Sequence, residues 1–233
     1  RDREADAAEL RAIQARLAAG DLEGAVAHAE AALAQGLEHP LTLNLAAGRL
    51  ESEDRYGEAL ALLERAHGLA PADLTVRQAL GLCLFRLQRY GPALPHFDAM
   101  VAAQPQFAPA HAARGATLEQ LGRAAEAEAA FRRAYELQPD NLLAIAGLAS
   151  TASGRGDHPR ARAFAEQVLA AEPGYPDAVM ALARADLAEG HYAEGDARLR
   201  ALIADPRTSE AQSKLAQALQ GEIRAAKDRK FDA

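Results

Sequence analysis

The chain has 233 residues, of which 49% are apolar and 25% are charged, so its composition is that of a folded protein rather than a disordered one. Its net charge of −7 argues against a nucleic-acid-binding surface, because such a surface neutralises phosphates with a concentrated basic face. The single cysteine excludes an internal disulfide and a thiolate zinc site, and polar or charged residues interrupt every apolar stretch that could otherwise insert into a membrane.

The sequence repeats with a period of 34 residues. Prolines recur at this interval, at Pro71, Pro105, Pro139 and Pro173. Alanines form a second column with the same spacing: Ala25, Ala59, Ala93, Ala127 and Ala161. The period predicts a lead-in of residues 1–5 followed by six tandem repeats, at residues 6–39, 40–73, 74–107, 108–141, 142–175 and 176–209.

Each repeat has the pattern of two short helices joined by a turn, and the second repeat shows it most clearly. Apolar residues from Leu43 to Leu50 follow helical spacing, stop at Asp54, and resume from Tyr56 until Pro71. The proline ends the second helix, because it lacks a backbone N–H and its ring clashes with a preceding carbonyl. The chain is therefore predicted to be all-α.

The first helix of the fifth repeat has an unusual composition. It contains Gly147, Ser150, Thr151, Ser153 and Gly154, which have small side chains and low helix propensity. We expect this helix to fray early or to leave a hollow against its neighbours.

Residues 210–233 follow the sixth repeat. Ser209 and Gln212 have the spacing of a capping box, and the apolar residues after them lie on one helical stripe. One interpretation is a helix that closes the array. The other is an incomplete seventh repeat, because residues 229–233 resemble the turn that opens the second helix of a repeat.

The residues that recur every 34 positions resemble the pattern of the tetratricopeptide repeat family. The third repeat matches the family pattern at Leu80, Gly81, Tyr90, Ala93, Phe97 and Pro105, and the fourth at Gly115, Gly122, Ala127, Phe131, Ala134 and Pro139. The sequence departs from the pattern in lacking the usual Trp, in having Leu37 in place of the first proline, and in having Gly195 in place of the last alanine. The resemblance implies a right-handed superhelical α-solenoid of helix-turn-helix repeats, and the Ala- and Arg-rich composition is similar to that of bacterial members.

The arrangements that catalysis or metal binding requires are missing from the sequence. It contains no pair of histidines at helical spacing with a glutamate, no phosphate-binding glycine loop and no nucleophile elbow. Its one thiol, Cys83, lies among leucines, where a small apolar side chain packs well. We therefore predict no catalytic, cofactor-binding or metal-binding residues.

The resemblance also implies a binding groove. In the family, one stripe of each first helix lines a concave groove that holds peptides. Carried over by position, the groove residues are Asn44, Gln78, Arg86, Ala112, Ala116, Glu119, Gln120, Ser150 and Arg184. Small residues in the fourth and fifth repeats are expected to leave space there for a mixed, neutral-to-basic peptide.

The predicted function is a non-catalytic scaffold that binds a protein or peptide segment in this groove. Chaperone-binding members of the family clamp a C-terminal carboxylate with Lys, Asn and Arg. Asn44 matches one clamp position, but Leu10, Gln14, Thr75 and Ala79 occupy others, which argues against a chaperone tail as partner.

Two alternatives stay open. The chain is the recognition arm of a larger enzyme, for example a transferase or hydroxylase, or it self-associates through its terminal helix. We expect a cytoplasmic location, with the periplasm as the other possibility.

Overall fold

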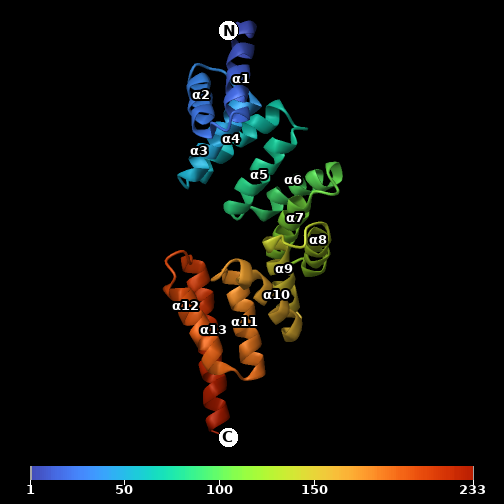
Figure 1. The fold of residues 1–233 in the computed structure, drawn as a ribbon, viewed down its shortest axis with the longest axis vertical. Helices are drawn as coiled ribbons and strands as arrows, with labels where there is room; N and C mark the ends of the chain where they lie inside the picture. Colours follow the sequence, from blue (N-terminus) through green and yellow to red (C-terminus); the bar gives the residue numbers. More distant parts are fainter. Residues whose placement is uncertain (1, 233) are drawn as a thin grey trace. The chain divides into compact units, whose positions relative to one another are not determined.

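The computed structural model describes residues 2–232, and these residues form thirteen α-helices and no strand (Figure 1). The helices are α1 (Arg3–Ala18), α2 (Leu22–Ala34), α3 (Pro40–Ser52), α4 (Tyr56–Leu69), α5 (Leu74–Arg86), α6 (Tyr90–Ala103), α7 (Ala108–Gln120), α8 (Ala124–Leu137), α9 (Leu142–Gly154), α10 (His158–Ala171), α11 (Pro176–Glu189), α12 (Tyr192–Ala204) and α13 (Glu210–Phe231). The predicted all-α fold of helix-turn-helix repeats is confirmed. No helix in this part of the chain combines the length and the apolarity needed to cross a membrane.

Side-chain caps and left-handed turn residues set the ends of these short helices. Asp21 accepts a hydrogen bond from the N–H of Gly24 at the start of α2, and Asn141 does the same for Ala144 in α9. The turn within a repeat needs one residue with positive φ, which Gly122 supplies at 75°. Gln88 takes the same turn position at φ 59°, a conformation that costs a residue with a Cβ about 1–2 kcal/mol.

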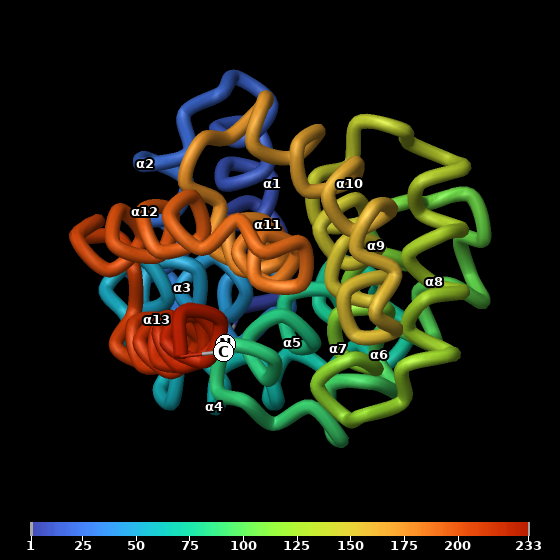
Figure 2. Tube along the Cα trace, turned by 90° about the horizontal axis from the view of Figure 1, so that it is seen from below, coloured from blue at the N-terminus to red at the C-terminus, as the bar shows by residue number. Residues whose placement is uncertain are grey.

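The chain divides into two compact units, one extending to Pro105 and the other beginning at Gln106. We call them unit 1 and unit 2. Within each unit, every helix packs against the next one along the chain. In unit 2, the Cα trace of Figure 2 shows α8, α9, α10 and α11 following one another side by side. Equivalent helices of neighbouring repeats also touch, such as α3 with α5 in unit 1 and α9 with α11 in unit 2. Contacts are therefore made between neighbours in sequence, as expected for a repeat protein.

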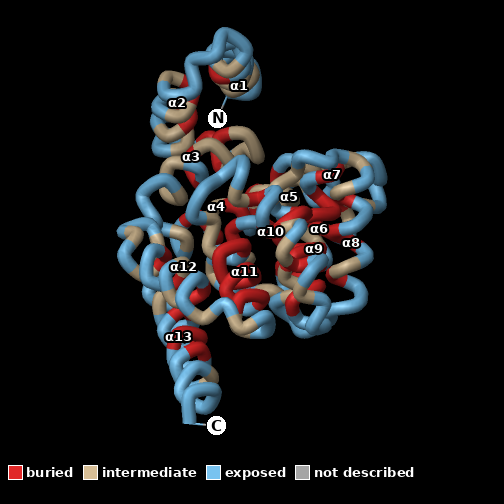
Figure 3. The backbone as a smooth tube through the Cα atoms, turned by 60° about the horizontal axis from the view of Figure 1, so that its bottom comes forward, coloured by how far each residue is buried: buried red, intermediate tan, exposed pale blue. Residues whose placement is uncertain are grey.

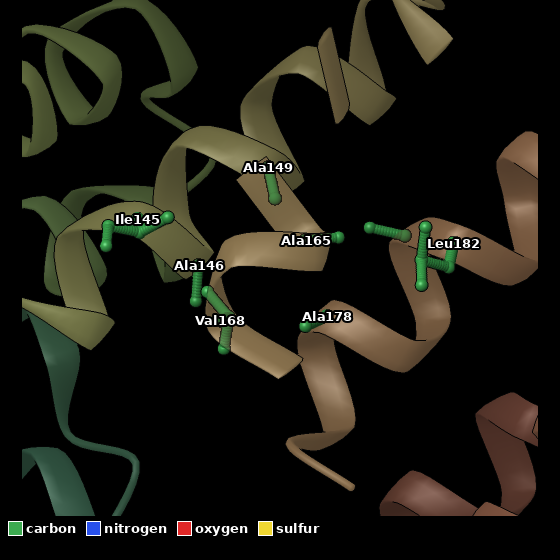
Figure 4. Packing of buried hydrophobic residues seen from close by; sticks show 8 residues of the cluster. Ile145, Ala146, Ala149, Ala165, Val168, Ala178 and Leu182 are labelled. Carbon is green, nitrogen blue, oxygen red and sulfur yellow. The ribbon is translucent and has the colours of Figure 1, made fainter. Parts of the chain in front are cut away.

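Alanine is the dominant residue where helices approach closely. In unit 2, one cluster joins α9, α10 and α11 (Figure 4). It contains Ile145, Ala146, Ala149, Ala165, Val168, Ala178, Ala181 and Leu182. Side chains this small let the helix axes approach one another, so the column of small residues in the sequence has a direct packing cause.

At Gly147 the fifth repeat leaves no hollow, because the ring of Phe131 fills the space beside it. Phe131 comes from α8 and is 0% exposed. A Cβ added to Gly147 would lie 2.5 Å from three ring atoms of Phe131, and one added to Gly115 would lie 2.8 Å from the ring. The glycines of α7 and α9 thus make room for one aromatic ring, and α9 continues as a helix through its low-propensity residues.

The terminal segment forms one helix of 22 residues, α13. The predicted capping box is confirmed, because the N–H of Gln212 donates to Ser209 Oγ at 3.2 Å and the N–H of Ser209 donates to Gln212 Oε1 at 2.9 Å. The turn expected at residues 229–233 is wrong for residues 229–231, because α13 continues through Phe231. Ala233 lies outside the described residues. Figure 3 shows buried positions in the middle of α13 and exposed ones toward its end.

A buried ion cluster joins three successive helices of unit 2, α10, α11 and α12. Asp186 in α11 is only 1% exposed. Its two carboxylate oxygens accept hydrogen bonds from Arg162 Nη2 of α10 at 2.6 Å and from Arg198 Nε of α12 at 2.9 Å. Arg162 also donates to Glu189 at 3.0 Å. Both lone-pair regions of the buried carboxylate are thereby matched by guanidinium groups.

Candidate functional site

A pocket of about 840 Å³ opens on unit 1 between the start of α2, α3 and α5. Its lining residues are Gly20, Asp21, Leu22, Glu23, Val26, Asn44, Leu45, Gly48, Arg49, Glu51, Ser52, Thr75, Gln78, Ala79 and Leu82. Three separate segments of the chain therefore build it, and α3 lies in the centre. We call this site the unit 1 pocket.

Helical periodicity places the lining residues of α5 on one stripe. Thr75, Gln78, Ala79 and Leu82 are spaced by three, one and three residues, so they share one face of the helix. On α3, the small residue Gly48 lies on the pocket side. A Cβ added to Gly48 would meet no atom within 4 Å, so the pocket is open above this position.

The walls of the unit 1 pocket carry exposed apolar side chains. Leu22 is 61% exposed and Leu82 is 44% exposed, while Val26 and Leu45 are partly buried. Leu22 stands at the beginning of α2 and Leu82 near the end of α5. Large aliphatic side chains from two different helices therefore face water in one concave site, which is a common property of ligand-binding pockets.

The polar groups in the pocket include two carboxamides, those of Asn44 and Gln78. Within residues 2–232, neither side chain makes a hydrogen bond to another residue. The hydroxyl of Thr75 is also without a protein partner in that range, although the Thr75 N–H donates to Asp73. These groups offer donors and acceptors to whatever enters the pocket.

The acidic side chains of the pocket differ in how they are compensated. Asp21 accepts from Arg16 Nη1 at 2.9 Å, and Glu23 lies 3.3 Å from Arg49 Nη2. Glu51 has no ion pair within 4 Å among the described residues. Burial raises the pKa of Glu51, and the neighbouring Cys83 thiol and the charge of Arg86 partly oppose this rise.

Cys83 lies next to this carboxylate and is fully buried. Burial, reinforced by the negative charge of Glu51, raises the pKa of the thiol to about 11. A thiol with so high a pKa stays protonated near neutral pH and is a poor nucleophile. Cys83 therefore acts as a packing residue, in agreement with its position among leucines, and its thiol donates a hydrogen bond to the backbone carbonyl of Tyr56 at 3.4 Å.

Two of the predicted groove residues, Asn44 and Gln78, line the unit 1 pocket. Arg86 is exposed on α5 but does not line it. Ala112 and Ala116 were predicted to face a ligand, but they are only 1% and 8% exposed. Ala112 packs against alanines of α8 and α9, so its small size serves helix contact and leaves no space for a peptide.

The remaining predicted residues lie in unit 2. Ser150 of α9 donates to Glu119 Oε1 of α7 at 2.6 Å, which links two first helices. Burial raises the pKa of Glu119 despite this hydrogen bond, and the charge of Asp177 adds to the rise. Gln120 and Arg184 are exposed. Burial also raises the pKa of Tyr175 to about 12, with Asp177 as the next contribution.

Sequence reasoning missed Leu22, Val26 and Leu82 as parts of the site. Leu82 lies on the same stripe of α5 as Gln78, so its position alone could have identified it. The start of α2 gave no such signal, because the family pattern places the second helix of a repeat outside the groove. Its contribution depends on how α2 packs against α3.

Comparison with known proteins identifies the repeats. A family model described as tetratricopeptide repeat matches residues 50–116 and 152–219, and a second model with the same description matches residues 108–141. The chain belongs to the tetratricopeptide repeat family. Its α-solenoid of helix-turn-helix repeats is the fold of that family, whose repeats typically form non-catalytic interaction domains.

A curated relative and several solved structures of this family are similar to the chain. It is 32% identical over 109 residues to the Hsp70-Hsp90 organizing protein of Triticum aestivum, and the match covers 47% of this chain and 19% of that protein. The chain thus spans about a fifth of the length of this relative.

Among solved structures, PilW, a type IV pilus biogenesis factor, matches with a TM-score of 0.68 and 20% identity over 93% of this chain and 100% of that chain. A tetratricopeptide repeat protein from Parabacteroides merdae matches with a TM-score of 0.65 and 17% identity over 97% of this chain and 92% of that chain. YrrB, a tetratricopeptide repeat protein with an unusual peptide-binding site, matches with a TM-score of 0.55 and 19% identity over 82% and 97%. At these identities the likeness shows the fold.

Proposed function

We propose that this chain is a non-catalytic scaffold whose unit 1 pocket binds a peptide segment of a partner protein. The observation that carries the proposal is a pocket of about 840 Å³ with exposed leucines on its walls and the unpartnered carboxamides of Asn44 and Gln78 inside. A carboxamide matches the donor and acceptor of a peptide backbone, while the leucines can cover an apolar side chain. We expect micromolar affinity, which corresponds to about −8 kcal/mol.

This proposal moves the main binding site from the fourth and fifth repeats to unit 1. In unit 2, Glu119, Gln120, Ser150 and Arg184 stay part of the proposal as a second contact surface. We rank this surface lower, because Glu119 and Ser150 satisfy each other by a hydrogen bond and the neighbouring alanines are buried.

We further propose that the partner is not a chaperone C-terminal tail, although the curated relative is an organizing protein of Hsp70 and Hsp90. Leu10 and Ala79 supply neither a cation nor a hydrogen-bond donor at clamp positions, and Gln14 supplies a carboxamide but no positive charge for a terminal carboxylate. Binding should therefore be unchanged when the free C-terminus of a peptide ligand is amidated. A tenfold loss on amidation would contradict this part of the proposal.

The experiment that tests the main proposal uses a phage library of random dodecapeptides selected on the wild-type chain. Gly48→Trp should fill the pocket, because the space above Gly48 is open. Gly68→Trp in α4 is the matched control, since an added Cβ there also meets no atom within 4 Å and Gly68 does not line the pocket. We expect at least tenfold weaker binding of selected peptides to Gly48→Trp and less than twofold change for Gly68→Trp. Equal binding to both variants would contradict the proposal.

The main alternative is that the chain is the recognition arm of an enzyme, such as a transferase or hydroxylase, whose catalytic domain lies elsewhere in a longer protein. The pocket would then recruit the substrate of that domain. The open reading frame decides between the two, because a scaffold needs no catalytic domain downstream or upstream. We propose the cytoplasm as the compartment, which cell fractionation tests.

Self-association through α13 is a second alternative for the partner. Leu215 on this helix is 59% exposed, and an exposed aliphatic side chain on a terminal repeat helix can meet a second copy. Sedimentation equilibrium should then give a mass that rises with concentration, and Leu215→Ser should abolish the rise. A constant monomer mass would exclude this alternative.

A further inference from the structure

The side chains that line the unit 1 pocket indicate which residues a bound peptide carries. This inference rests on the proposed function. Aliphatic side chains form part of the pocket wall. They are Leu22 and Val26 of α2, Leu45 of α3 and Leu82 of α5. Between them Gly48 leaves open space. Together these residues fit one apolar side chain of leucine or phenylalanine size, which would cover leucines that are now in water.

The charged groups of the same pocket are unevenly satisfied. Asp21 is paired with Arg16, and Arg49 lies within 4 Å of both Glu23 and Glu30. Glu51 is the acidic lining residue for which the described chain supplies no cation within that distance. Its neighbours are the Cys83 thiol, whose hydrogen bond of 3.4 Å goes to the Tyr56 carbonyl, and Arg86, whose charge acts from farther away.

Partial burial makes this carboxylate a favourable place for an incoming cation. A half-buried charge has lost part of its hydration and gains most from a partner of opposite sign. An acidic or phosphorylated peptide would instead bring negative charge toward Glu51 and Glu23, which disfavours binding. The charge of the pocket therefore selects among peptides that all satisfy its apolar walls.

We infer that the unit 1 pocket recognises a peptide that carries an apolar side chain of leucine or phenylalanine size and, within a few residues of it, a lysine or arginine whose cation contacts Glu51. The apolar side chain packs between Leu22 and Leu82. The carboxamides of Asn44 and Gln78 hold the backbone between these two anchors.

The test begins with the dodecapeptides that bind wild type and lose binding to Gly48→Trp. Their consensus should contain an apolar residue close to a basic one. A capped synthetic peptide of that consensus is then compared with its Lys→Gln or Arg→Gln form by isothermal titration calorimetry. On wild type, the loss of the cation should weaken binding about tenfold, which corresponds to about 1.4 kcal/mol.

The same two peptides are next measured on Glu51→Gln, with Glu53→Gln as the control. Glu53 is exposed, lies two residues away, pairs with Arg55 and does not line the pocket. Glu51→Gln should make the two peptides bind equally, whereas Glu53→Gln should keep the tenfold difference. The double-mutant comparison isolates the contact between the cation and Glu51.

The outcomes separate this inference from the proposed function. If Gly48-dependent peptides carry no basic residue, or if the tenfold difference persists in Glu51→Gln, the inference is overturned while peptide binding in the pocket stands. If no selected peptide depends on Gly48, the proposed function itself fails and the inference fails with it. Urea denaturation of each variant shows whether a loss of binding is a loss of folding.

Discussion

Replacing Gly147 by alanine tests how tightly unit 2 is packed. A Cβ at this position would lie 2.5 Å from three ring atoms of Phe131, and that ring is 0% exposed, so it has no solvent space to enter. Inserting a methyl group into a filled core costs about 1–3 kcal/mol. Alanine gains about 1 kcal/mol over glycine in a helix. We expect Gly147→Ala to lower the free energy of unfolding by roughly 0–2 kcal/mol.

The matched control is Gly221→Ala in α13 of the same unit. An added Cβ there meets nothing within 4 Å, so only the gain in helix propensity remains and the free energy of unfolding should rise by about 1 kcal/mol. Urea denaturation followed by far-ultraviolet circular dichroism gives both values. The difference between the variants, about 1–3 kcal/mol, measures the cost of overpacking.

A second substitution identifies the neighbour responsible. Phe131→Leu removes the ring, so Gly147→Ala should cost less in that background than in the wild type. If Gly147→Ala stabilised the chain as much as Gly221→Ala, or if Phe131→Leu left its effect unchanged, the packing of α9 against this ring would be refuted.

Three further predictions concern stability. Asp186→Ala leaves two arginines without their buried carboxylate and should lower the free energy of unfolding by about 3 kcal/mol in a urea titration, whereas a change below 1 kcal/mol would show that the ion cluster is not formed. Ala127→Leu should cost about 1–3 kcal/mol and the exposed Ala102→Leu less than 0.5 kcal/mol, and equal melting temperatures would contradict the assignment of the alanine column. Burial lowers the pKa of His96 below 6.5, and the charges of His67 and Arg77 lower it further, so the unfolded state binds the proton more readily than the folded state. The free energy of unfolding should therefore fall as the pH drops through 6.5 toward the lower pKa of the folded state. His96→Gln should make this dependence of stability on pH less steep.

The helices and turns of this chain could be predicted because their signals are local. A proline ends a helix through its own ring, and a residue at the turn position takes positive φ whether it is Gly122 or Gln88. The capping box of Ser209 and Gln212 likewise lies within four residues. Features that depend on a few neighbouring residues can thus be predicted from the sequence alone.

The site was predicted only in part, because burial depends on what packs over a residue. Ala112 and Ala116 hold groove positions in the family pattern, yet both are covered by neighbouring helices. The same limit applies to Asp186, whose arginine partners lie 24 and 12 residues away and show no motif. Leu22 joins the pocket only through the packing of α2 beside α3.

Side-chain amide resonances of Asn44 and Gln78 report whether a peptide occupies the unit 1 pocket. Two-dimensional ¹H–¹⁵N spectra of the labelled chain are recorded while a selected, capped dodecapeptide is titrated in. If the peptide binds there, both carboxamide NH₂ pairs and the backbone signal of Gly48 should shift progressively with one dissociation constant. Saturable binding that leaves these signals in place and shifts those of unit 2 instead would contradict binding in the unit 1 pocket.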